Sequence, residues 1–126
     1  MKLKTKILII CSHGINRSKY LASYLMRKGY STRFGGIKDE AENPLKKEDI
    51  DWADIIIFAQ KKHINYFKEK YPNIKKKMLI LGVSDCPETI ARDFPDFKWN
   101  KKDNFNKVWT HPQLRKSIKK HLPLKK

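Results

Sequence analysis

Short continuous runs of aliphatic residues alternate along the chain with longer segments in which apolar residues recur every three or four positions. Residues 7–10 and 55–58 are uninterrupted apolar runs, as expected of strands buried on both faces. Residues 78–81 form another such run, and residues 30–34 are a short segment rich in β-prone residues. The pattern therefore predicts four strands.

The segments between these runs have the spacing of amphipathic helices. Residues 17–28 and 61–71 fit this pattern, and Pro72 ends the second helix. Residues 110–113 resemble a capping box with proline in the first turn, which predicts a last helix beginning there. We expect residues 82–109 to be irregular.

Strands and helices in this order favour an α/β fold, a small doubly wound three-layer sandwich with a four-stranded parallel sheet. A chain of 126 residues suits a single domain spanning residues 1–126. Because parallel sheets of this kind bind ligands at the carboxyl ends of their strands, functional residues are expected just after a strand.

The chain is strongly basic, with 29 Lys and Arg against 13 Asp and Glu and a net charge of +16. Of the basic residues, 18 follow Gln60, together with only 6 of the acidic ones. Such a field favours an acidic or polyanionic partner. No recognised nucleic-acid-binding motif accompanies the charge.

The apolar run at residues 7–10 is too short for a secretion signal, and no segment approaches the length of a membrane span. Cys11 and Cys86 are the only cysteines, so the chain has neither a disulfide framework nor a set of zinc ligands. We therefore expect a reduced, cytoplasmic protein that uses no membrane and no metal or other cofactor.

The segment that carries chemistry runs from Cys11 to Ser18, where the first strand ends and the first helix begins. A loop in this position directs several backbone N–H groups at one point, with the positive end of a helix dipole behind them. The same field that binds phosphate stabilises a thiolate, which would make Cys11 a nucleophile. The alternative is a buried cysteine followed by an ordinary polar loop.

Several residues of this loop suit a phosphate site. Arg17 can hold two phosphoryl oxygens with its planar guanidinium, and Ser18 can donate a hydrogen bond to the Cys11 sulfur. Gly14 suits a tight loop whose amides face inward. We expect the substrate to contact Ser12, His13, Gly14, Ile15, Asn16 and Ser18. His63 can contact the loop from the next helix, but we favour a surface position for it.

The sequence Cys-Ser-His-Gly-Ile-Asn-Arg-Ser resembles the C-x5-R-S phosphate loop of the low-molecular-weight protein tyrosine phosphatases. Three later segments also resemble this family: Trp52-Ala53-Asp54-Ile55-Ile56-Ile57-Phe58, Asp85-Cys86-Pro87-Glu88 and His111-Pro112-Gln113-Leu114. The last two resemble its small prokaryotic branch. The resemblance implies a phosphatase that hydrolyses phosphotyrosine or similar aryl phosphomonoesters through a cysteinyl-phosphate intermediate. Its partner would be a phosphorylated protein or a small phosphomonoester.

The resemblance also implies a general acid, and Asp85 fits that role because it follows the strand at residues 78–81. Asp93 and Asp96 are rivals in the same segment. The sequence departs from the family at two positions. Gly14 stands where members usually have an asparagine that braces the loop, and Asn16 stands where many have a second cysteine.

Other functions fit parts of the pattern. An arsenate reductase on the same scaffold would use Cys11 to attack arsenate and Cys86 to resolve the adduct. A phosphocarrier of the sugar phosphotransferase type also has a loop beginning Cys-Ser-x-Gly, but Arg17 argues against it. A binding-only adaptor for phosphoproteins or nucleic acid would rest on the +16 charge alone.

Overall fold

Four parallel strands form the centre of the molecule in the computed structural model, which describes residues 4–100 and 104–126. The strands lie in the order β2-β1-β3-β4, and all neighbouring pairs are parallel. This arrangement confirms the predicted α/β sheet. Its strands are β1 (Lys6–Cys11), β2 (Ser31–Gly36), β3 (Ile55–Phe58) and β4 (Lys77–Ile80).

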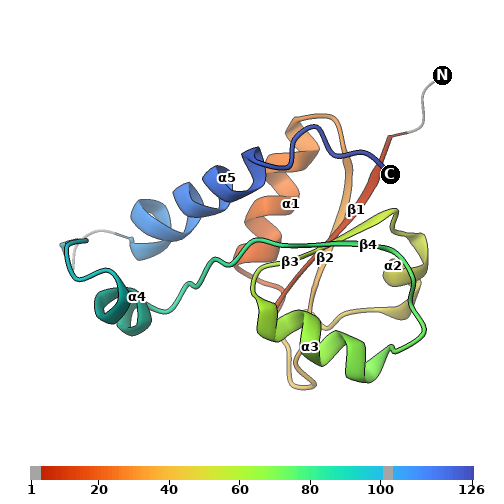
Figure 1. Cartoon of the computed structure of the whole chain (residues 1–126), viewed down its shortest axis with the longest axis horizontal. Coiled ribbons are helices and arrows are strands. Elements are labelled where there is room, and N and C mark those ends of the chain that lie inside the picture. The colour runs from red at the N-terminus through yellow and green to blue at the C-terminus, as the bar shows by residue number, and fades with distance from the viewer. Residues whose placement is uncertain (1–3, 101–103) are drawn as a thin grey trace.

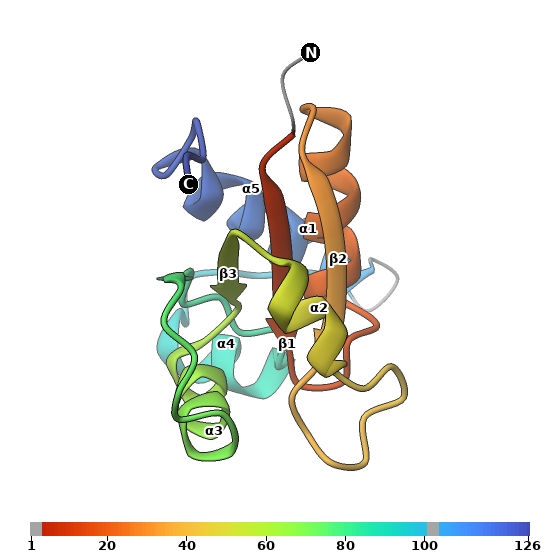
Figure 2. The same ribbon diagram turned by 90° about the vertical axis from the view of Figure 1, so that its right-hand side faces the viewer.

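Helices cover both faces of the sheet. Figure 1 shows the strands between α1 (Arg17–Arg27) and α5 (His111–Lys119) above and α3 (Lys61–Lys70) below. In Figure 2, α2 (Lys47–Trp52) lies in front of the strands, and α1 and α5 lie behind them. Helix α3 packs on the same core as α2.

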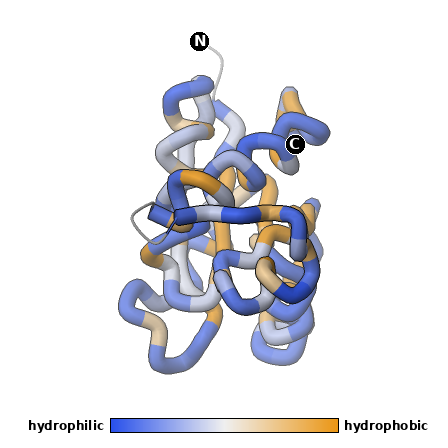
Figure 3. Tube along the Cα trace, turned by 90° about the vertical axis from the view of Figure 1, so that its left-hand side faces the viewer, coloured by the Kyte–Doolittle hydropathy of each residue, from blue (hydrophilic) through white to orange (hydrophobic). Residues whose placement is uncertain are grey.

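Alternate residues of the central strand point into the two cores, which explains its uninterrupted apolar run. Ile7 and Ile9 pack with α1 and α5, whereas Leu8 and Ile10 pack with α2 and α3. All four side chains are almost completely buried. Figure 3 shows the same distribution, with the hydrophobic stretches running through the interior and the hydrophilic ones on outer helices and loops.

Three helical segments differ from the prediction. Helix α4 (Pro87–Asp93) and the π-helix η1 (Asn106–Thr110) lie in the stretch expected to be irregular, and α2 was not predicted. The predicted capping box at residues 110–113 is wrong, because Thr110 is helical and its side chain caps nothing. The helix begins earlier, at η1, and continues directly into α5.

The connections bring three loops to one edge of the sheet. From β1 the chain crosses to β2 on one side and later returns to β3 on the other side of β1. The carboxyl ends of β1 and β3 therefore flank the point where the strand order reverses, which is the usual ligand site of such sheets. The segment after β4 reaches the same edge. No helix in the described part of the chain is long and apolar enough to cross a bilayer.

Candidate active site

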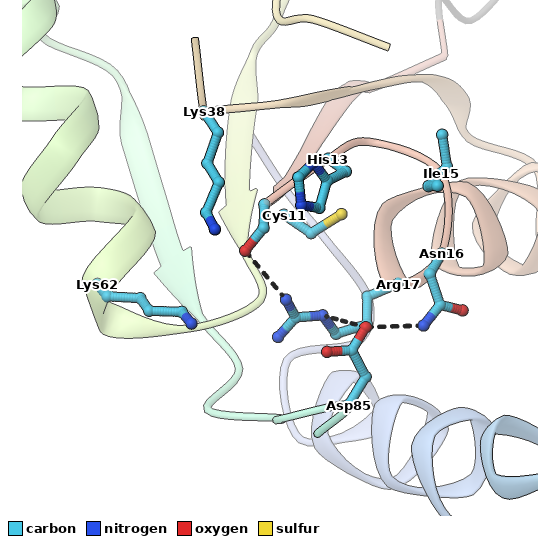
Figure 4. Close-up of a pocket in the computed structure, with 9 residues that line it drawn as sticks. Cys11, His13, Ile15, Asn16, Arg17, Lys38, Lys62 and Asp85 are labelled. Carbon is cyan, nitrogen blue, oxygen red and sulfur yellow. Dashed lines mark hydrogen bonds and ion pairs between the residues drawn. The ribbon is translucent and has the colours of Figure 1, made fainter. Parts of the chain in front are cut away.

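A cavity of about 300 Å³ opens at this edge (Figure 4). It gathers residues from the loop after β1, the segment after β2, the start of α3 and the segment after β4. Its lining includes every predicted site residue except Gly14 and Ser18. The lining residues are Cys11, Ser12, His13, Ile15, Asn16, Arg17, Lys38, Lys62 and Asp85.

The backbone of the loop is turned so that its carbonyl groups face away from the cavity. The carbonyls of residues 11–13 accept hydrogen bonds from the backbone N–H groups of Ile37, Lys38 and Asn43, at 2.9, 3.2 and 3.1 Å. Among the described residues, none accepts a hydrogen bond from the backbone N–H groups of residues 12–16. Such a run of unused amides is the arrangement that binds an anion.

Gly14 and Asn43 hold the loop in this shape. Gly14 has a φ of +74°, and the Asn43 side chain donates to its carbonyl oxygen at 3.1 Å. The same amide nitrogen lies 3.3 Å from the carbonyl oxygen of Phe34 in β2. Asn43 thus braces the loop from outside. In the family that the sequence resembles, an asparagine at the position of Gly14 has this role. No motif in the sequence marked Asn43.

The sulfur of Cys11 lies at the floor of the loop. Its side chain is buried, and its Sγ is 3.2 Å from the Oγ of Ser18, which is also buried. This is the predicted pair. The Ser18 hydroxyl can donate to the sulfur once Cys11 is a thiolate, and the N-terminus of α1 favours a negative charge at this place.

Arg17 is buried and its guanidinium is held from several sides. Its Nη1 donates to Gln60 Oε1 at 2.5 Å and to the carbonyl oxygen of Val83 at 2.8 Å. Its Nε forms an ion pair with Asp85 Oδ2 at 3.3 Å. The remaining nitrogen, Nη2, makes one hydrogen bond to a described residue, to Ser12 Oγ at 3.5 Å. Two segments distant in sequence, at Gln60 and at residues 83–85, therefore fix the orientation of this cation.

The surface position expected for His63 is wrong, because the ring is buried beneath the loop. Its Nδ1 accepts the backbone N–H of Gln60 at 3.1 Å, which assigns the ring proton to Nε2, and Nε2 lies 2.9 Å from Ser12 Oγ. Burial, together with the nearby charges of Arg17 and Lys62, lowers the pKa of His63 to about 3. The ring is thus neutral and donates to Ser12.

Asp85 lies across the cavity mouth from the lysines. Its Oδ2 accepts a hydrogen bond from Asn16 Nδ2 at 2.7 Å, and its side chain is 30% exposed. Neither rival carboxylate lines this cavity: Asp93 borders a separate cavity beyond Gln60, and Asp96 is exposed.

Solved structures of phosphatases share this arrangement of strands and helices. A low-molecular-weight protein tyrosine phosphatase from Streptococcus pyogenes superposes with a TM-score of 0.61 at 12% identity, over 95% of each chain. A tyrosine phosphatase from Erwinia amylovora also gives 0.61, at 16% identity over 94% of this chain and 93% of its own. The chain has the low-molecular-weight protein tyrosine phosphatase fold.

This phosphatase fold also occurs in an arginine phosphatase from Geobacillus stearothermophilus, with a TM-score of 0.54 and 19% identity over 92% of this chain and 84% of the other. No protein-family model and no curated protein matches the sequence. The likeness is therefore one of fold.

The aromatic residues of the segment after β4 and the second cysteine both lie away from the cavity. Among the described residues, no Phe, Tyr or Trp lines the cavity, and Phe94, Phe97 and Trp99 pack with one another or with Trp109. Cys86 is exposed and its thiol donates to Glu88 Oε2 at 3.2 Å, outside the lining of the cavity.

Proposed function

We propose that the protein is a phosphatase that hydrolyses phosphotyrosine or similar aryl phosphomonoesters through a phosphocysteine formed on Cys11. The observation that carries this proposal is the loop at residues 12–16, which connects a buried cysteine to a fixed arginine and whose backbone N–H groups have no acceptor among the described residues. These groups can stabilise a transferring phosphoryl group by positioning and electrostatics.

In the first step the Cys11 thiolate attacks the phosphorus atom. A bond from sulfur to phosphorus forms as the bond from phosphorus to the aryl oxygen breaks, and Asp85 gives its proton to the departing phenolate. Arg17 and the loop amides bind the equatorial phosphoryl oxygens, whose charge grows in the transition state. Ser18 stabilises the sulfur as nucleophile and later as leaving group.

In the second step Asp85 takes a proton from water, and the water oxygen attacks the phosphocysteine. The bond from sulfur to phosphorus breaks, inorganic phosphate leaves, and the Cys11 thiolate is regenerated. The Ser12 hydroxyl accepts a hydrogen bond from neutral His63, so its own proton is available to a phosphoryl oxygen. The reaction requires a reduced Cys11, and both cysteines are free; we place the activity in the reducing cytoplasm.

An apolar residue at the cavity wall supports the choice of an aryl substrate. Ile15 lines the cavity and is 46% exposed, so its aliphatic side chain can pack against an aromatic ring whose phosphate enters the loop. Both tyrosine and arginine phosphatases share the fold, so the substrate must be tested directly.

The first experiment is hydrolysis of para-nitrophenyl phosphate by the wild type and by Cys11→Ser, with rapid acid quenching to trap phosphoprotein. The wild type should turn over the substrate and accumulate phosphate on Cys11, whereas Cys11→Ser should show only trace turnover while still binding phosphate. Activity in Cys11→Ser would contradict the mechanism. Arsenate reduction, assayed beside it, would instead favour the reductase if it depended on both Cys11 and Cys86.

The role of Asp85 is tested with leaving groups of different basicity. If Asp85 protonates the phenolate, Asp85→Asn should slow a poor leaving group by about 10²–10⁴-fold and a good one much less. Asp93→Asn and Asp96→Asn serve as controls. A loss in Asp85→Asn that is equal for all leaving groups would mean that Asp85 only orients Arg17, with which it is paired.

A further inference from the structure

Two lysines line one side of the cavity, opposite Ile15. Lys38 follows β2 and Lys62 is the second residue of α3, so they reach the site from different elements. Figure 4 shows both side chains extending toward the space above the phosphate loop. In the described part of the chain, neither lysine forms an ion pair with a carboxylate.

The backbones that carry these lysines are fixed to the loop. The backbone N–H of Lys38 donates to the carbonyl oxygen of Ser12 at 3.2 Å. Lys62 directly precedes His63, whose ring bonds to the Ser12 hydroxyl at 2.9 Å. Both side chains are long and exposed. The backbone positions that carry them are nevertheless held beside Ser12, one after β2 and one in α3.

The cavity lining carries cations beyond the arginine of the phosphate loop. Arg17 and the backbone amides of residues 12–16 already face the position of a bound phosphate, and Lys38 and Lys62 add two cations at the rim. We propose that the two lysines form a subsite for a second anionic group, which selects phosphotyrosine segments with an acidic residue next to the phosphotyrosine. This inference rests on the proposed phosphatase activity and names its preferred substrate.

A phosphotyrosine peptide bound in the cavity would place its neighbouring side chains beside the two lysines. When the ring of a phosphotyrosine packs on Ile15 and its phosphate enters the loop, the peptide backbone remains at the cavity mouth. The neighbouring side chains are then at the level of the two exposed lysines, where a carboxylate meets Lys38 or Lys62. The net charge of +16 draws an acidic segment toward the molecule over a longer range.

The test compares two phosphotyrosine peptides that differ only in having Glu or Gln beside the phosphotyrosine. The quantity measured is the ratio of their kcat/KM values in wild type, Lys38→Gln, Lys62→Gln and the double variant. Each exposed charge pair should contribute about two- to fivefold. The wild type should therefore prefer the Glu peptide, each single variant should lower the ratio, and the double variant should bring it close to one.

Lys61→Gln is the matched control, because Lys61 precedes Lys62 on the same helix, carries the same charge and does not line the cavity. Its ratio should equal that of the wild type. An equal fall for both peptides in the Lys38 and Lys62 variants would overturn the inference, since the lysines would then act on the phosphoryl group alone. Absence of para-nitrophenyl phosphate hydrolysis in the wild type would instead contradict the proposed activity itself.

Discussion

The shape of the phosphate loop depends on one glycine. Replacing this glycine would be costly for two reasons. Gly14 has a φ of +74°, a conformation that side-chain-bearing residues adopt at a cost. A Cβ atom placed there would also lie 2.5 Å from both the carbonyl oxygen of Asn43 and the backbone nitrogen of Gly36. Those atoms belong to the backbone and cannot move without disturbing the brace that holds the loop.

Gly14→Ala should therefore lower the free energy of unfolding by about 3 kcal/mol or more, because conformational strain and a backbone clash add. Gly29→Ala is the matched control, since Gly29 has a φ of +100° but a Cβ atom there would meet no other atom within 4 Å. It should cost only about 1–2 kcal/mol. Urea unfolding followed by tryptophan fluorescence measures both. Equal losses would show that the close approach to Asn43 is not important.

His63 gives the fold a defined dependence on pH. Its pKa is about 3 in the folded protein, against an ordinary value of 6.5, because the ring is buried beside cations. The unfolded chain therefore binds a proton that the folded one does not. The stability due to neutral His63 is complete above pH 6.5 and is lost as the pH falls toward 3.

We expect the free energy of unfolding of the wild type to fall between about pH 7 and pH 4.5, and to fall less in His63→Gln. Urea titrations at several pH values check this, with His121→Gln just after α5 as control. If His63→Gln and the wild type show parallel pH profiles, the ring is not buried in its neutral form.

The sequence predicted the residues of the loop but not the residues that hold it. Cys11, Arg17 and Ser18 were identified because their spacing at a strand-to-helix junction has a chemical meaning. Asn43, Gln60 and Val83 bond to Gly14 or Arg17 across sequence separations of 29, 43 and 66 positions. Only the register of the folded sheet brings such ordinary residues to the site.

At the scale of elements, α2 is a short helix whose end is secured by a lysine from another segment. The Nζ of Lys76 donates to the carbonyl oxygens of Ile50, Asp51 and Ala53 at 2.6, 2.7 and 2.7 Å. These carbonyls lie at the C-terminal end of α2, where a positive charge also favours the helix dipole. One side chain thus connects the approach to β4 with α2.

Lys76→Met should destabilise the protein by about 1–3 kcal/mol, because three carbonyl groups lose a charged donor. Lys75→Met is the control, since Lys75 directly precedes Lys76, is equally basic, and makes no side-chain hydrogen bond or ion pair to another described residue. Thermal unfolding compares the two. A loss of equal size in both variants would attribute the effect to net charge rather than to the bonds with α2.

Elements that bury a continuous apolar run or a regular helical face were predicted well, and short helices were not. The continuous apolar runs of β1 and β3 and the helical spacing of α1 and α3 were visible because each buries a regular face. Helices α2 and α4 have six and seven residues and bury one side chain each, so they show no periodicity. A cap was predicted at residues 110–113, but the helix already includes Thr110 as the last residue of the π-helix η1.

At the scale of the whole molecule, the site exists only when the sheet is complete. Its lining comes from segments that follow three of the four strands and from α3, so no part of the cavity forms in isolation. An anion that binds the folded site therefore stabilises the entire fold against unfolding. The net charge of +16 adds a second effect, because any salt screens the repulsion among the basic residues.

Inorganic phosphate at about ten times its dissociation constant should raise the free energy of unfolding by about 1.4 kcal/mol. Sodium chloride of equal ionic strength gives the screening effect alone, so the difference between the two salts isolates binding at the loop. Cys11→Ser should retain this difference, because the loop amides and Arg17 remain, whereas Arg17→Ala should lose most of it. If phosphate and chloride stabilise the wild type equally, the loop at residues 12–16 is not an anion site, and the proposed phosphatase mechanism loses its basis.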